Sequence, residues 1–179
     1  MISLILPMFF SLTSISTPTD PWYTAEKNSR DASKAIHFCI NYMNGWLAQA
    51  DPISGLTPRR IDRDYFWNAR DCAADNFPYL LLTAHMTGLH YASLATEEML
   101  RTEQRLTNRV DSLPDTYDLK KQGFLTETPD MEEVVFGSSE YAKDGLMPVT
   151  EWRGERPWLD RMKILDEDLW KNALYTTPQ

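Results

Sequence analysis

The segment YFWNARDCAADNFP, from Tyr65 to Pro78, gathers the side chains of this chain that are best suited to chemistry. It combines aromatic faces, an arginine and two aspartates, Asp71 and Asp75, that lie four residues apart. On a helix this spacing places both carboxylates on one face. Two carboxylates held close together raise the pKa of one of them, as a general acid requires. The segment predicts a polar-ligand pocket or, more simply, the polar start of a buried helix.

Five stretches with helical spacing must position this segment. We expect helices over 29–50, over 68–87 or 76–87, over 90–110, over 128–143 and from 157 onward. The second is apolar nearly all round after Pro78, which indicates a helix enclosed by others, and Asp75 or Asn76 is its expected cap. No stretch shows the alternation of a strand, so the sequence predicts an all-α fold of antiparallel helical hairpins without a sheet.

The composition favours one domain of ordinary size, with 179 residues and 42% hydrophobic side chains. A net charge of −8 argues against nucleic-acid binding. Residues 1–19 carry no charged side chain, and their apolar run over 2–12 is too short to span a bilayer. We expect 1–19 to be a signal peptide or a disordered or core-docked N-terminus, and 20–179 to be a single α-helical domain. The signal peptide implies a secreted or periplasmic protein; an uncleaved anchor is a third alternative.

The cysteines and histidines offer no cofactor chemistry by their spacing. Cys39 and Cys72 are expected on helices at unequal distances from the intervening loop, too far apart for a disulfide, so both are expected to be free thiols. The three histidines are dispersed and match no zinc-binding pattern. We therefore expect neither a metal nor a cofactor.

A resemblance to a known family rests on the loop DPISGLTP and the following stretch DYFWNARDCAADNFPYLLLTAHM. Together with the preceding helix they look like the opening hairpin of α/α-toroid proteins, the six-hairpin glycosidase-like folds that include many glycoside hydrolases and polysaccharide lyases. The matching residues are Asp51, Pro52, Ser54, Gly55, Leu56, Pro58, Trp67, Asn68, Asp71, Ala74, Asp75, Asn76 and Pro78. A looser match covers 136–151, FGSSEYAKDGLMPVTE.

A closed toroid has about twice as many helices as this chain, which has room for about five to six. The resemblance therefore implies a partial α/α-toroid-like array, either as the N-terminal part of a longer protein or as a small relative with another way of completing its core. Missing C-terminal hairpins or a homo-oligomer would then cover an apolar face.

The resemblance implies a saccharide as the partner and a site near the loop 51–78. Aromatic rings would stack on sugars, and amides and guanidinium would bind hydroxyls or acidic groups. A glycosidase needs two carboxylates roughly 5 to 10 Å apart. The expected catalytic residues are Asp71 with Glu140 or Glu151 as its remote partner. The expected substrate-binding residues are Tyr65, Trp67, Asn68, Arg70 and Asp75.

Each of these side chains also has a structural interpretation. Trp67 suits a helix-packed core, and Arg70 could form an ion pair or cap with a neighbouring aspartate. Glu140 has a lysine three residues on and Glu151 stands in a polar loop. The sequence thus predicts a carbohydrate-active protein, glycoside hydrolase-like if it is an enzyme. The alternatives are a non-catalytic helical interaction module and an inactive fragment.

Overall fold

The computed structural model describes residues 20–63, 65–154 and 156–173. The chain divides into two compact units, 1–35 and 36–179. The described part of the first unit is the N-terminal portion of helix α1 (Pro21–Leu47), whose side chains are exposed there. All further elements belong to the second unit. The expected signal peptide at 1–19 lies outside the described residues.

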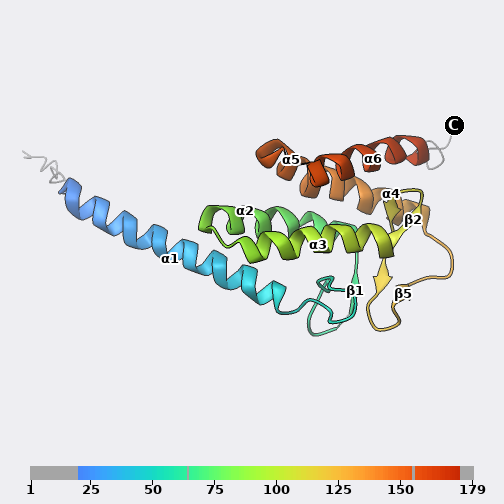
Figure 1. Cartoon of the computed structure of the whole chain (residues 1–179), viewed down its shortest axis with the longest axis horizontal. Coiled ribbons are helices and arrows are strands. Elements are labelled where there is room, and N and C mark those ends of the chain that lie inside the picture. The colour runs from blue at the N-terminus through green and yellow to red at the C-terminus, as the bar shows by residue number, and fades with distance from the viewer. Residues whose placement is uncertain (1–19, 64, 155, 174–179) are drawn as a thin grey trace, which may run out of the picture. The chain divides into compact units, whose positions relative to one another are not determined.

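The second unit is built from helices, as predicted. After α1 they are the π-helix η1 (Ala69–Ala74), α2 (Phe77–Thr87), α3 (His90–Thr107), α4 (Met131–Glu140), the π-helix η2 (Tyr141–Leu146), α5 (Met147–Arg153) and α6 (Arg156–Ala173). Helices α2 and α3 lie side by side, and α6 packs on α4, η2 and α5 (Figure 1). The prediction of an all-α fold with about five to six helices is confirmed.

The expectation that the chain lacks a sheet is wrong. Two small antiparallel sheets are present: β1 (Phe66–Trp67), β4 (Tyr117–Asp118) and β5 (Gly123–Phe124) form one in the order β1-β4-β5, and β2 (Asn108–Val110) pairs with β3 (Leu113–Pro114) in the other. Strands of two or three residues are too short to show a period-2 pattern, which needs about four residues or more. The helix expected over 90–110 ends earlier, at Thr107, and β2 begins at the next residue.

Two details of α2 also differ from the prediction. Asn76 occupies its N-cap position, but its side chain makes no capping hydrogen bond. The helix is not enclosed all round, because Leu82 and Met86 are exposed although Phe77 and Leu80 are fully buried. Gly88 ends the helix as expected, in a left-handed conformation with φ of 69° that glycine adopts without strain.

A buried ion pair joins the distant parts of the second unit. Arg161 on α6 donates from Nε and Nη2 to the carboxylate of Glu103 on α3, at 2.8 and 3.0 Å, and both side chains are at most 1% exposed. The same guanidinium donates to the carbonyl of Ser112 and to Asn108, and Tyr141 Oη donates to Glu103. All three nitrogens of the guanidinium donate hydrogen bonds, so the charges of the pair are compensated although both are removed from water.

Breaking this pair will destabilise the chain strongly. Arg161→Met leaves an uncompensated buried carboxylate, which costs about 3–5 kcal/mol. Arg101→Met, which removes an exposed arginine on α3, should cost less than about 1 kcal/mol. The free energy of unfolding from urea denaturation at neutral pH checks both. Equal costs for the two variants would contradict the role given to the pair.

Candidate functional site

The loop after α1 is fixed by Asp51, which is buried. Its Oδ2 accepts hydrogen bonds from Ser54 N and Oγ at 2.7 and 2.8 Å and from Gln122 at 3.2 Å, and its Oδ1 accepts one from Tyr65 Oη at 3.2 Å. Burial alone would raise the pKa of Asp51, but the hydrogen bonds from Ser54, Gln122 and Tyr65 outweigh it and lower that pKa. Tyr65, expected to bind substrate, is therefore a member of the network that closes this loop.

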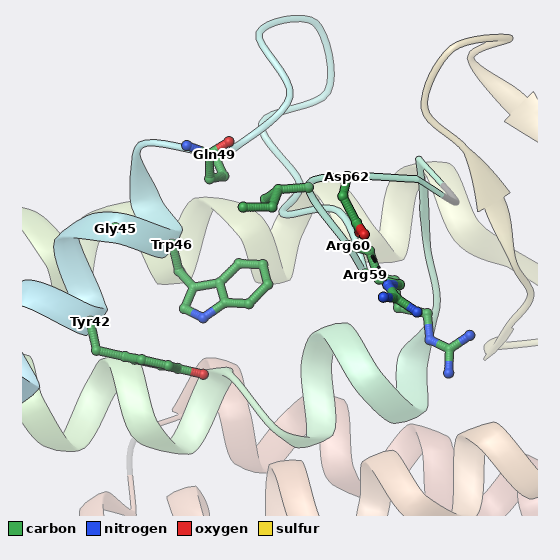
Figure 2. Close-up of a pocket in the computed structure, with 8 residues that line it drawn as sticks. Tyr42, Gly45, Trp46, Gln49, Arg59, Arg60 and Asp62 are labelled. Carbon is green, nitrogen blue, oxygen red and sulfur yellow. Dashed lines mark hydrogen bonds and ion pairs between the residues drawn. The ribbon is translucent and has the colours of Figure 1, made fainter.

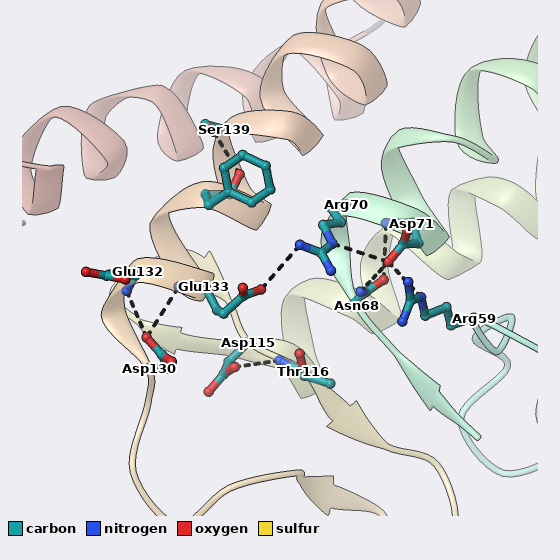
Figure 3. A network of polar contacts seen from close by, with 11 residues as sticks. Arg59, Asn68, Arg70, Asp71, Asp115, Thr116, Asp130, Glu132, Glu133 and Ser139 are labelled. Atoms are coloured by element: carbon teal, nitrogen blue, oxygen red, sulfur yellow. Dashed lines mark hydrogen bonds and ion pairs between the residues drawn. The ribbon is translucent and has the colours of Figure 1, made fainter. Parts of the chain in front are cut away.

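Asp71, the expected catalytic acid, is the centre of a polar network (Figure 3). Its Oδ2 lies 2.9 Å from Arg59 Nε and 3.4 Å from Arg70 Nε, and it accepts a hydrogen bond of 2.6 Å from Asn68 Nδ2. Asn68 is also the N-cap of η1, because its Oδ1 accepts from the backbone N–H of Asp71 at 3.1 Å. Asn68 and Asp71 thus start the π-helix and hold two arginines beside it.

Arg70 bridges η1 and α4. Its Nη1 lies 3.5 Å from the carboxylate of Glu133 (Figure 3). Its guanidinium carbon lies 5.7 Å from the ring centroid of Phe136. The hollow beside Asn68 and Arg70 measures only about 20 Å³, which holds about one water molecule. A sugar ring does not fit there.

Trp67, expected to stack on a ligand, is 0% exposed. It lies in β1 opposite Tyr117 of β4 and belongs to the main core. The burial of Trp67 therefore supports the structural interpretation, in which its ring packs in the core and offers no face to a ligand.

Asp75 stands near three other carboxylates. Partial burial and then the charges of Asp71, Asp144 and Glu140 raise the pKa of Asp75, although its side chain is largely exposed. The charge of Glu140, one of the expected catalytic residues, thus acts on Asp75. These two residues cap the π-helices η1 and η2, which pack on each other. Glu140 itself lies 2.9 Å from Lys143. A raised pKa keeps a carboxyl protonated, so that it can donate a proton, but Asp75 does not line the hollow beside Asn68 and Arg70.

Glu151 is not part of this group. It lies on α5 with an exposed side chain, and α5 begins after η2 has ended. The polar loop expected around Glu151 is instead the last part of a short helix that Gly154 terminates.

A much larger pocket lies between the end of α1 and the segment 59–62 (Figure 2). Its volume is about 550 Å³, within the range of roughly 300–1,000 Å³ typical of small-molecule sites. Its lining consists of Tyr42, Gly45, Trp46, Gln49, Arg59, Arg60, Ile61 and Asp62. All of these residues belong to the second unit.

Two aromatic rings form adjacent walls of this pocket. The rings of Tyr42 and Trp46 have centroids 6.3 Å apart and planes 63° from parallel. Tyr42 also packs edge-on against Tyr79 of α2, at 4.6 Å. Met43, between them on the helix, is fully buried in a small core that includes Leu80 of α2. The end of α1 is thus anchored to α2 while its aromatic side chains still face the pocket.

Two arginines form the opposite wall (Figure 2). The backbone N–H of Arg59 donates to Phe66 O at 2.8 Å, which ties the segment to β1, and the Arg59 side chain reaches Asp71. Arg60 Nε lies 3.2 Å from Asp62 Oδ1. The pocket therefore combines flat apolar surfaces with guanidinium donors, a combination that binds rings carrying polar or anionic groups.

The sequence predicts a site near the loop 51–78. This pocket includes residues 59–62 of that loop but none of the residues expected to bind substrate. The available signal was the pair of arginines directly after Pro58, in a connection that is long for a helical hairpin.

Cysteine, metal and membrane features add no second site. Cys39 and Cys72 are free thiols, and burial raises the pKa of Cys72 to about 12. Within residues 20–63, 65–154 and 156–173, no cluster of three metal-ligating side chains occurs. In the same ranges no helix has both the length and the apolar character needed to cross a bilayer.

Comparisons with family models, with curated proteins and with solved structures gave no match to this chain.

The Asp51 network predicts a loss of stability at acid pH. Because the folded pKa of Asp51 is lower than its ordinary value of 3.8, its contribution is full above that value and is lost as the pH falls through the folded pKa. Asp51→Asn should cost about 1–3 kcal/mol at neutral pH. Urea denaturation as a function of pH checks this. The deficit relative to the wild type should shrink below pH 3.8; a deficit that is constant down to about pH 2 would contradict the assignment.

Proposed function

We propose that this chain is a non-catalytic saccharide-binding module whose site is the pocket between α1 and the segment 59–62. The observation that carries the proposal is that the aromatic corner of Tyr42 and Trp46 and two arginines line one pocket of about 550 Å³. Sugar rings present apolar C–H faces to aromatic side chains and hydroxyl groups to arginine and glutamine, so this lining supplies both kinds of contact.

A hydrolase is the weaker proposal for this chain. The hydrolysis of a glycosidic bond needs two carboxylates on either side of a substrate cleft. Asp71 is engaged by Asn68, Arg59 and Arg70, and the neighbouring hollow of about 20 Å³ excludes a sugar. The raised pKa of Asp75, to which the charge of Glu140 contributes, suits a general acid and is the feature that favours a hydrolase.

A second candidate function is a helical interaction module. A shallow apolar pocket of about 210 Å³ lies between α2 and α5 and is lined by Pro78, Leu82, Pro148, Val149 and Trp152. Leu82 and Trp152 are each more than two-fifths exposed. Apolar surface of this kind favours contact with a protein partner, and this candidate predicts binding that is insensitive to changes at Tyr42 and Trp46.

If this pocket binds saccharides, removing its aromatic rings should weaken binding. The purified chain is titrated by calorimetry with trisaccharides of glucose, mannose, xylose, N-acetylglucosamine, galacturonate and glucuronate. Trp46→Ala and Tyr42→Ala should each weaken the binding of every ligand that binds the wild type, by about 5- to 30-fold for a loss of about 1–2 kcal/mol of ring contact.

Trp170→Ala is the matched control, because Trp170 is 73% exposed and lies on α6 outside this pocket. It should bind like the wild type, and circular dichroism establishes that each variant is folded. Binding to none of the sugars, or equal binding by the wild type and the folded Trp46→Ala variant, would overturn the proposal. Release of new reducing ends from a trisaccharide would instead support the proposal that the chain is a hydrolase.

A further inference from the structure

We infer that Arg60 makes the pocket selective for saccharides that carry a carboxylate, and that Asp62 pairs with Arg60 when no such ligand is bound. This inference rests on the proposed function, and it assigns the ligand class of the same site. Its basis is the charge of the pocket lining, the different anchoring of the two arginines and the exposure of the pair formed by Arg60 and Asp62.

The pocket is positive in an acidic chain. The whole sequence carries a net charge of −8. The pocket lining holds two arginines and one aspartate, which gives a net charge of +1. The negative charge of the chain as a whole repels anions. The arginines of this pocket attract them locally, so we expect anionic ligands to bind here in preference to the rest of the surface.

The two arginines differ in how firmly they are held. Arg59 is bound at 2.9 Å by Asp71, which is itself bonded to Asn68, and it lies 5.8 Å from the ring centroid of Phe66. This arginine is already committed to the start of η1. It can shape the pocket, but a ligand that displaced Asp71 would disrupt the cap of the π-helix.

Arg60 is held less firmly than Arg59. Its Nε lies 3.2 Å from Asp62 Oδ1, and the two side chains are 40% and 62% exposed. Ion pairs exposed to this degree contribute little, because water screens them. The contact leaves the two Nη atoms of the guanidinium fork to face a ligand. A carboxylate can accept two parallel hydrogen bonds from such a fork, a stronger arrangement than the single contact with Asp62.

Asp62 is therefore a competitor of the ligand. Bound to Arg60, it keeps the guanidinium paired in the empty pocket; with a uronate in place, its own charge repels the ligand carboxylate. The two residues should have opposite effects on acidic ligands and little effect on neutral ones, since stacking on Tyr42 and Trp46 is common to both.

The test compares uronic acid trisaccharides, tri-galacturonate and tri-glucuronate, with their full methyl esters, which keep the rings and remove the charge. Calorimetry on the wild type should give an acid form at least about fivefold tighter than its ester. Arg60→Gln should reduce that preference to about twofold or less without changing the affinity for the ester. Asp62→Asn should strengthen acid binding about two- to fivefold and leave ester binding unchanged.

Matched controls are Arg101→Gln and Glu98→Gln, which remove charges from an exposed ion pair on α3 and should leave the acid-to-ester ratio unchanged. The preference of the wild type should also fall as the NaCl concentration rises from about 50 to about 500 mM.

The outcomes separate this inference from the proposed function. Loss of all binding in Trp46→Ala, together with equal affinity of the wild type for acid and ester, would overturn the inference and keep the function. An Arg60→Gln variant that still binds the acid more tightly than the ester would also overturn the inference and leave the proposed function standing. If neither acids nor esters bind the wild type but a neutral trisaccharide does, the inference is overturned and the proposed function stands; if no trisaccharide binds, both are overturned.

Discussion

The ion pair of Glu103 and Arg161 is the interaction on which the rest of the second unit depends. Two charges that are at most 1% exposed are tolerated only if every donor and acceptor finds a partner. Arg161 therefore fixes Ser112 and Asn108 in the hairpin of β2 and β3, and Glu103 fixes Tyr141 at the start of η2. One side chain on α6 thus sets the positions of α3, the hairpin and the π-helix.

The consequences of this pair extend to the pocket through backbone hydrogen bonds. The hairpin leads into β4, which pairs with β1 through Tyr117 and Trp67. The carbonyl of Phe66 in β1 accepts from the N–H of Arg59, so the cationic wall of the pocket is attached to the sheet. The aromatic wall is attached independently, through the packing of Tyr42 and Met43 on α2. Both walls of an open pocket are in this way supported by buried structure, as preorganised binding requires.

Much of the fold could be predicted from sequence periodicity, and less of the site. The stripes of α1, α3 and α6 are long and one-sided, so the existence of these helices followed from spacing alone. The short strands and the π-helices could not be predicted, because they depend on long-range pairs such as Tyr117 with Trp67. For Trp67 and Arg70 the residue types allow both core and ligand roles. The complete burial of Trp67 supports its role in the core, and the ion pair with Glu133 gives Arg70 a structural role.

The segment from Tyr65 to Pro78 is polar for a structural reason. A chain that enters a buried helix through a strand and a π-helix has many backbone groups to satisfy, and Asn68 and Asp71 satisfy some of them while tethering Arg59 and Arg70. Such a junction resembles an active site in composition because both need converging hydrogen-bonding groups. The groups that face open space stand instead in the preceding loop and at the end of α1.

The central claim is that ligands bind at the corner formed by Tyr42, Trp46 and Arg60, away from the acidic cluster. Two-dimensional ¹H–¹⁵N NMR during titration with tri-galacturonate tests it most directly. We expect shifts in the indole N–H of Trp46 and in the backbone amides of Arg60 and Asp62, with the amides of Asp75 and Glu140 unchanged. Shifts centred on Asp75 and Glu140, with Trp46 unaffected, would show that ligands bind elsewhere.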